Sequence, residues 1–279
     1  MDEQPSLYGK NPINNISKIR IHHLQKMKEQ NQKWVMLTSY DMYTAAIFEA
    51  ADIPVLLVGD SASNNVFGYD TSLPVTVDEL IPLVRAVTRS TQRPLIIADL
   101  PFGSYQGSVE QCFSTAVRFI KEGGAQAVKL EGGIEMVPQV EKLVSSGIPV
   151  MAHIGFTPQA EHQLGGYKVQ GKDDDGQQLI EAAKAFELAG AFALLIEMVP
   201  AKVGEAITNA VEIPTVGIGA GNSCDAQVLV WQDMAGLRNG RLPRFVKQYA
   251  DMNKLLLEAA KAFTADVVNG DFPSEDHNF

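Results

Sequence analysis

VLLVGDS, residues Val55 to Ser61, begins as an apolar run and ends in a glycine, a carboxylate and a hydroxyl. An apolar run of this length that stops at such residues is typical of a buried strand. The same transition recurs along the chain, so that five apolar runs deliver ionisable residues at their carboxyl ends: Asp60, Asp99, Lys129 with Glu131, His153 and Glu197. Five such endings predict one common site at the carboxyl ends of the strands.

Apolar runs alternate with helical patterns over most of the chain. The strand candidates are residues 34–38, 53–58, 95–98, 125–130, 148–152, 192–196, 213–218 and 227–231. Strands that alternate with helices predict βαβ units and a parallel sheet. Eight units in about 250 residues match a (β/α)8 barrel. The predicted fold class is therefore α/β, a TIM barrel with an N-terminal helical extension.

An open, doubly wound sheet is the alternative fold. Such a sheet places its ligand at one switch point, whereas the polar groups here follow many strands. No GxGxxG motif follows the first strand, and no GxxxxGK[ST] motif occurs, so nucleotide-binding folds lose support.

The domain organisation is expected to be simple. We expect a single barrel domain over residues 1–279, with a loose arm at 1–15 and an N-terminal helix at 16–28. The longest loop, residues 155–176, is rich in glycine. Loops of this length inside a compact domain are usually functional and often act as lids.

Composition excludes several classes of protein. The 279 residues are 46% hydrophobic and 20% charged, and the formal net charge is −10 with no basic cluster, which argues against a nucleic-acid partner. Cys112 and Cys224 lie too far apart in the sequence for a CxxC motif, and they indicate unpaired thiols in a reducing compartment. No apolar run reaches the roughly 18 residues of a membrane span. The expected location is cytoplasmic, without a membrane partner.

The strand ends favour a hard metal ion. Lys129 and Glu131 share one face of their strand by its period of two, and both are aimed into the barrel mouth. They can form a simple ion pair, and Asp60 and Asp99 can each cap the segment that follows. Together with Glu131, however, the two aspartates supply the oxygen ligands that Mg²⁺ prefers.

Two further ionisable residues have alternative interpretations. His153 fits a metal ligand or a hydrogen-bonded structural histidine. Glu197 lies between Ile196 and Met198, where partial desolvation suits a general base, but it also fits an ordinary strand-end carboxylate.

Several motifs then stand in one characteristic order. They are VGDS at 58–61, ADLPF at 98–102, VKLEGG at 128–133, HIGFTPQ at 153–159, GGYKVQG at 165–171 and GIGAG at 217–221. In this order, from about Ser17 to the C-terminal tail, the chain resembles the ketopantoate hydroxymethyltransferase family. The pattern departs from the family at Ala62-Ser63, where Leu-Gly is common, and at Ala152, where Gly is common. These departures concern the shape of the pocket rather than its chemistry.

The resemblance implies a Mg²⁺-dependent barrel enzyme of pantothenate biosynthesis. Such enzymes transfer a hydroxymethyl group from 5,10-methylenetetrahydrofolate to 3-methyl-2-oxobutanoate, through an enolate that Mg²⁺ stabilises. By the matching motifs, Asp60, Asp99 and Glu131 would form the metal site, Glu131 directly or through water. Asp60, Ser61, Asp99, Lys129 and His153 would contact the keto acid, and Glu197 would be the catalytic base.

The resemblance also implies a homodecamer. An apolar final helix region, expected from about Phe245 to Asn269, independently favours a homo-oligomer because it exceeds what one barrel helix needs.

Two other functions are the alternatives for a barrel of this kind. A lyase or mutase of the isocitrate lyase and phosphoenolpyruvate mutase group would carry a cysteine in a Lys-Lys-Cys-Gly-His type of loop, which is absent. A non-catalytic barrel that serves as a binding or scaffold protein would need no base, so Glu197 beside the metal ligands argues against it.

Overall fold

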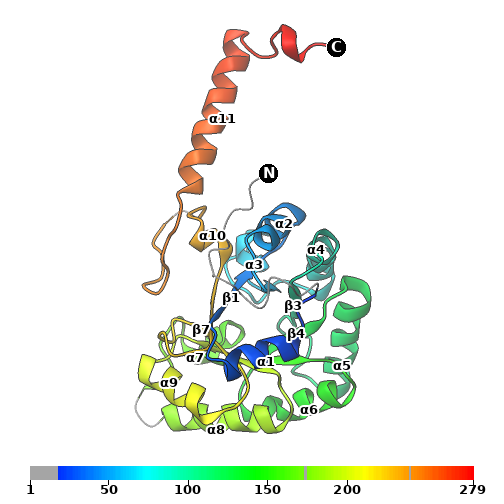
Figure 1. Ribbon diagram of the computed structural model, residues 1–279, viewed down its shortest axis with the longest axis vertical. Coiled ribbons are helices and arrows are strands. Elements are labelled where there is room, and N and C mark those ends of the chain that lie inside the picture. The colour runs from blue at the N-terminus through cyan, green and yellow to red at the C-terminus, as the bar shows by residue number, and fades with distance from the viewer. Residues whose placement is uncertain (1–17, 173–174, 239) are drawn as a thin grey trace. The chain divides into compact units, whose positions relative to one another are not determined.

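The computed structural model describes residues 18–172, 175–238 and 240–279, and within these residues eight parallel strands close into one barrel (Figure 1). Each strand pairs with the next along the chain. The strands are β1 (Trp34–Thr38), β2 (Val55–Val58), β3 (Leu95–Asp99), β4 (Ala127–Glu131), β5 (Val150–Gly155), β6 (Ala193–Glu197), β7 (Thr215–Ile218) and β8 (Ala226–Leu229). The predicted TIM barrel is confirmed.

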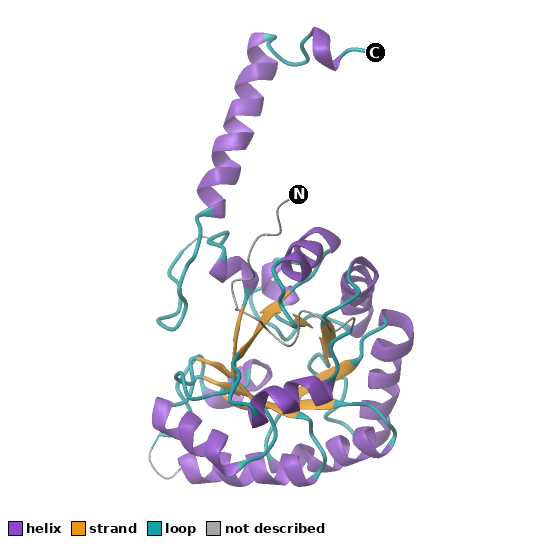
Figure 2. Ribbon diagram, viewed as in Figure 1, coloured by secondary structure: helices purple, strands orange, loops and turns teal. Residues whose placement is uncertain are grey.

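Helices cover the outside of the barrel (Figure 2). They are α2 (Met42–Ala50), α4 (Val77–Ser90), α5 (Val109–Arg118), α6 (Val137–Ser145), α8 (Asp175–Leu188) and α9 (Ala201–Ala210). The short helices α3 (Ala62–Asn65) and α7 (Glu161–Leu164) lie in the connections that follow β2 and β5. Local sequence sets several helix starts: Asp41, Thr76 and Ser108 occupy N-caps, and each side chain accepts hydrogen bonds from the first turn.

The N-terminal helix closes one end of the barrel. In the region expected to be helical at 16–28, α1 covers Ile21–Glu29; residues 16 and 17, like the arm at 1–15, lie outside the described residues. Leu24 and Met27 of α1 belong to the same buried cluster as the strand residues Met36 and Val55. The amino ends of the strands are therefore sealed by apolar packing.

The chain divides into two compact units between Val228 and Leu229. The second unit contains α10 (Trp231–Met234) and α11 (Met252–Asn269). The helix expected from Phe245 thus begins later, after Asp251, whose side chain accepts the amide N–H of Lys254. The sequence predicts a single domain over residues 1–279. That expectation remains a prediction, because a division into compact units by itself does not define separate domains.

The inner faces of the strands change from apolar to polar towards their carboxyl ends. In β3 and β4 the core residues Ile97 and Ala127 are followed, two positions later, by Asp99 and Lys129. The same spacing of two leads from Met151 to His153 in β5 and from Leu195 to Glu197 in β6. Because side chains alternate between the two faces of a strand, one face supplies both the core and the polar site above it.

The long loop expected at 155–176 contains regular structure. A short 3-10 helix (Pro158–Ala160) and α7 (Glu161–Leu164) lie within it. A lid function of this segment remains a prediction.

Candidate active site

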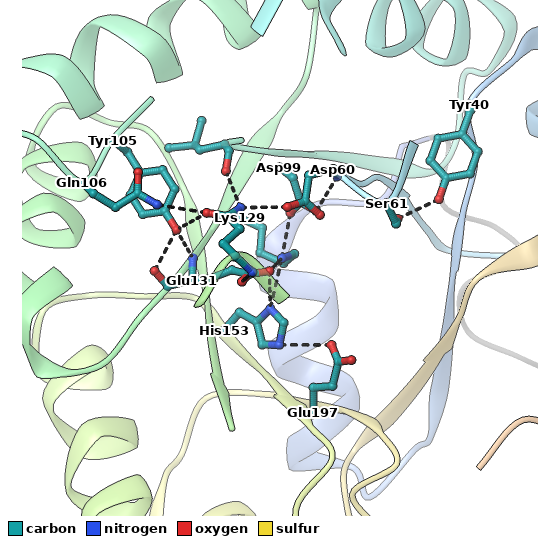
Figure 3. A network of polar contacts seen from close by, with 12 residues as sticks. Tyr40, Asp60, Ser61, Asp99, Tyr105, Gln106, Lys129, Glu131, His153 and Glu197 are labelled. Carbon is teal, nitrogen blue, oxygen red and sulfur yellow. Dashed lines mark hydrogen bonds and ion pairs between the residues drawn. The ribbon is translucent and has the colours of Figure 1, made fainter. Parts of the chain in front are cut away.

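A lysine lies at the centre of the polar cluster (Figure 3). Lys129 Nζ is 2.9 Å from Asp99 Oδ1, 3.6 Å from Glu131 Oε1 and 3.2 Å from His153 Nδ1. The strand register explains this grouping, because Asp99 is paired with Lys129 and Glu131 with His153 on neighbouring strands. The ion pair expected between Lys129 and Glu131 is present, but it is not a simple pair, because Lys129 lies closer to Asp99 and also contacts His153.

Glu197 joins the cluster through the histidine. His153 Nδ1 lies 3.2 Å from Glu131 Oε1, and His153 Nε2 lies 3.3 Å from Glu197 Oε2. The histidine is fully enclosed, whereas the side chain of Glu197 is 14% exposed. Glu197 is therefore positioned by a buried neighbour while its side chain keeps some exposure to solvent.

Asp60 is held from both sides. Its backbone N–H donates to Asp99 Oδ2 at 3.0 Å, and its Oδ2 accepts from Gln159 Nε2 at 2.8 Å. Neither aspartate begins a long helix, since Thr76 and Ser108 are the N-caps of α4 and α5. Both carboxylates therefore belong to the site.

Ser61 lies at the edge of the cluster, and a hydrogen bond of 2.8 Å joins its Oγ to the hydroxyl of Tyr40. The structure thus joins the six ionisable residues that the sequence assigned to the site through hydrogen bonds and ion pairs, and it places Ser61 beside them as the residue that follows Asp60 (Figure 3).

Four polar residues of this network were not predicted: Gln106, which donates from Nε2 to Gln159 Oε1 at 3.0 Å, and the three that follow. Gln159 donates its backbone N–H to Glu131 Oε2 at 3.1 Å, besides its bond to Asp60. The Tyr105 hydroxyl oxygen lies 2.8 Å from both the Glu131 carbonyl oxygen and Gln159 Oε1, so its single proton is shared between these two acceptors. Tyr40 was also missed. Gln159 is part of the HIGFTPQ motif, but no periodicity marks any of the four as a site residue.

The electrostatics of the site oppose the ionisation of Asp60. Burial raises its pKa well above the usual range, and the carboxylates of Asp99 and Glu131 raise it further. Burial also raises the pKa of Asp99, although Lys129 opposes this. Burial by itself would lower the pKa of Lys129. The carboxylates of Asp99 and Glu131 outweigh this effect, so the pKa of Lys129 is raised.

His153 favours the charged form. Burial lowers its pKa and Lys129 adds to this effect, but Glu131 and Glu197 outweigh both and raise the pKa to about 9. In turn, burial opposes the ionisation of Glu131, but His153 and Lys129 prevail and lower its pKa. Two cations thus face three buried carboxylates, so an ionised Asp60 requires further positive charge.

This charge balance suits a divalent cation. The available donors are carboxylate oxygens, which hard cations such as Mg²⁺ prefer over nitrogen or sulfur. Among the residues that the structure describes, no three His, Cys, Asp or Glu side chains already form a metal-holding group. Mg²⁺ is commonly held by only one or two carboxylates together with water and substrate oxygens, so the residues present fit the ion.

Comparisons with known proteins identify the family. The sequence model described as ketopantoate hydroxymethyltransferase matches residues 18–275. The chain belongs to the ketopantoate hydroxymethyltransferase family. The family resemblance expected from the motifs is therefore confirmed.

Relatives within this family are similar over almost their whole length. A protein from a Nocardioides species, named 3-methyl-2-oxobutanoate hydroxymethyltransferase, is 63% identical over 95% of this chain and 90% of its own. Proteins of the same name from an Arthrobacter species and from Mycolicibacterium vanbaalenii are 58% and 54% identical. These matches cover 99% and 100% of this chain, and 96% and 100% of the relatives.

Solved structures agree on the fold. Phosphonopyruvate hydrolase, in a complex with oxalate and Mg²⁺, has a TM-score of 0.60 at 13% identity, over 92% of this chain and 93% of that one. A 2,3-dimethylmalate lyase of the phosphoenolpyruvate mutase and isocitrate lyase superfamily has a TM-score of 0.59 at 14% identity, over 92% and 91% of the chains. At this identity the likeness concerns the barrel fold alone.

No helix among the described residues is both long and apolar enough to span a membrane.

Proposed function

We propose that the chain transfers a hydroxymethyl group from 5,10-methylenetetrahydrofolate to 3-methyl-2-oxobutanoate. Water is consumed, and the products are 2-dehydropantoate and tetrahydrofolate. Family membership supports the reaction type. The observation that carries the proposal is the buried carboxylate and lysine cluster, joined through His153 to the partly exposed Glu197.

The residues that would hold Mg²⁺ are Asp60 and Asp99, with Glu131 completing the site. When bound, Mg²⁺ supplies a Lewis acid that lowers the cost of negative charge on the ketone oxygen of the substrate. Lys129 lies against the same carboxylates, so its ammonium group is available to stabilise charge on that oxygen as well.

Ser61 would orient the carboxylate of the keto acid. Its hydroxyl is fixed by Tyr40, so it can point a donor at the substrate without first becoming ordered. His153, enclosed beside Lys129, contributes a second positive group to the same side of the site.

Glu197 would remove the proton from C3 of the keto acid. The C3–H electron pair then forms the new bond to the one-carbon unit, and water provides the hydroxyl group. His153 Nε2, 3.3 Å from Glu197 Oε2, holds the carboxylate in one orientation. A positioned base of this kind contributes about 10²- to 10⁴-fold to a proton transfer.

The test is hydrogen exchange at C3 in D₂O, followed by NMR without folate. Glu197→Gln is expected to bind Mg²⁺ and keto acid but to exchange at least about 10²-fold more slowly, because exchange needs only deprotonation. Glu205→Gln, at an exposed position of α9, is the matched control. Exchange at the wild-type rate in Glu197→Gln would show that Glu197 is not the base.

We also propose a homodecamer in the cytoplasm. The exposed apolar residues of α11, which has no buried residue, support assembly. Fractionation of cells tests the location.

A further inference from the structure

A cavity of about 370 Å³ lies beside the carboxylate cluster. Its walls come from the segments that follow β2, β3, β4 and β5, and they include Phe102, Tyr105, Glu135, Met136 and Gln163. This volume falls in the range of roughly 300–1,000 Å³ that is usual for small-molecule sites. The cavity lies wholly within the barrel unit, at the same end as the site.

The cavity and the cluster share a wall. Glu131 and Gln159 line the cavity, and Gln159 also contacts Asp60. Tyr105 continues this wall through its hydrogen bonds to Glu131 and Gln159. Figure 3 shows Tyr105 and Gln106 beside Glu131, at the end of the network opposite to Tyr40 and Ser61. A molecule in the cavity would therefore approach the cluster from the side opposite to Ser61.

The lining does not suit the anionic keto acid. Among the described residues that line the cavity there is no Lys or Arg, and His162 is the one basic side chain. Two carboxylates, Glu131 and Glu135, face it instead. These carboxylates would repel a carboxylate ligand and attract N–H donors.

The remaining lining suits a flat heteroaromatic ring. Phe102 is 51% exposed, so its ring is available for stacking, and Met136 adds a polarisable apolar surface. Glu135 Oε1 accepts the Gly133 N–H at 2.7 Å, which fixes the carboxylate. An ionised carboxylate has about four lone-pair sites, so it can accept further N–H groups from a ligand.

We infer that this cavity binds the pterin ring of the folate co-substrate. The amino-pyrimidinone edge of a pterin presents N–H donors, which match Glu135, and its ring face matches Phe102. The inference rests on the proposed function, and it places the one-carbon donor across the Glu131–Gln159 wall from the keto acid.

The test compares two substitutions in the cavity with one beside it. Phe102→Ala removes the stacking surface, and Gln163→Trp fills the cavity from an exposed position. Ile134→Ala is the control, because Ile134 is 53% exposed on the same loop as Glu135 but is not part of the lining. The measurements are the KM for 5,10-methylenetetrahydrofolate, calorimetric binding of tetrahydrofolate, and folate-free exchange at C3.

Loss of one stacking contact is expected to raise the folate KM by ~10-fold in Phe102→Ala, with a parallel loss of tetrahydrofolate affinity. Gln163→Trp should also raise the folate KM and weaken tetrahydrofolate binding. In both variants the rate of folate-free exchange at C3 should stay within about twofold of the wild-type rate. Unchanged KM and affinity in both variants would overturn the inference. Absence of exchange in the wild-type enzyme would instead overturn the proposed function, so the two failures are distinguishable.

Discussion

Asp60 is a buried carboxyl group whose neighbours oppose its ionisation. Burial and the nearby Asp99 and Glu131 carboxylates all raise its pKa, so folding without metal favours the protonated form. The contribution of Asp60 to stability is therefore complete below its unfolded pKa of about 3.9 and is lost as the pH rises through the folded value. Each pKa unit of this shift corresponds to about 1.4 kcal/mol at neutral pH.

Asp60→Asn should remove this penalty. In EDTA at pH 7 the variant is expected to be more stable than the wild type, because a neutral amide needs no counter-charge. The variant should also lack the contribution of Asp60 to the pH dependence of stability, which is a loss of stability as the pH rises through the folded pKa of Asp60. Thermal melts at several pH values measure both effects. A variant that is less stable than the wild type in EDTA at pH 7 would contradict the pKa argument.

Asp60→Asn should weaken metal binding, although it is expected to stabilise the metal-free protein. Asp60→Asn and Asp99→Asn are both expected to lose Mg²⁺ affinity by calorimetry, since each removes an ionised oxygen donor. Asp99→Asn should also destabilise the protein, by up to about 3–5 kcal/mol, because it takes a partner from the buried Lys129. Mg²⁺ binding that is unchanged in both variants would remove these residues from the proposed metal site.

Tyr40 positions Ser61 rather than contacting the carboxylates. Tyr40→Phe keeps the buried ring but deletes the hydroxyl bonded to Ser61 Oγ. Loss of a hydrogen bond worth about 0.5–1.5 kcal/mol should raise the KM for keto acid by roughly two- to tenfold. Folate KM should not change, and steady-state kinetics separate the two. A rise in folate KM alone would place Tyr40 elsewhere in the mechanism.

Local sequence fixes where the helix α4 begins. Thr76 Oγ1 accepts the Glu79 N–H at 3.2 Å, and Glu79 Oε2 accepts the Thr76 N–H at 2.8 Å, a capping box. Thr76→Ala should therefore destabilise the fold by about 1 kcal/mol in denaturant unfolding. Ser145→Ala, another exposed hydroxyl in a helix, is the control and should stay within about 0.5 kcal/mol. Equal effects of the two substitutions would show that the cap is not responsible.

The strand pattern was readable because it is local. Apolar runs that end in Asp60, Asp99, Lys129 and Glu197 predicted both the barrel and the membership of its polar cluster. The boundaries of some strands differ from the predicted ones. The strand expected at 213–218, for example, begins at Thr215. Such boundaries depend on pairing with neighbouring strands, which local propensity does not contain.

The supporting residues could not be predicted for a related reason. Gln159 contacts Asp60 across 99 positions of sequence, and Tyr105 reaches Gln159 across 54. Hydrophobic periodicity and motif spacing describe neighbouring residues, so they do not predict contacts between residues this far apart in the sequence. They depend on how the barrel brings its loops together, so they become visible only once the fold is known.

The apolar residues of α11 support the proposed homo-oligomer. Leu256, Phe263 and Val267 follow helical spacing, yet they are 63%, 57% and 47% exposed. A contiguous apolar stripe of this kind on a soluble helix marks an interaction site. Light scattering is expected to find a homo-oligomer, with ten chains as the proposed number.

Leu256→Glu should shift the mass towards smaller species, because an ionised carboxylate is costly in an apolar interface. Lys261→Glu, which changes charge on the same helix without touching the stripe, should leave the mass unchanged. A wild-type chain that is monomeric at micromolar concentration would contradict the proposal, and so would a Leu256→Glu variant that assembles as the wild type does.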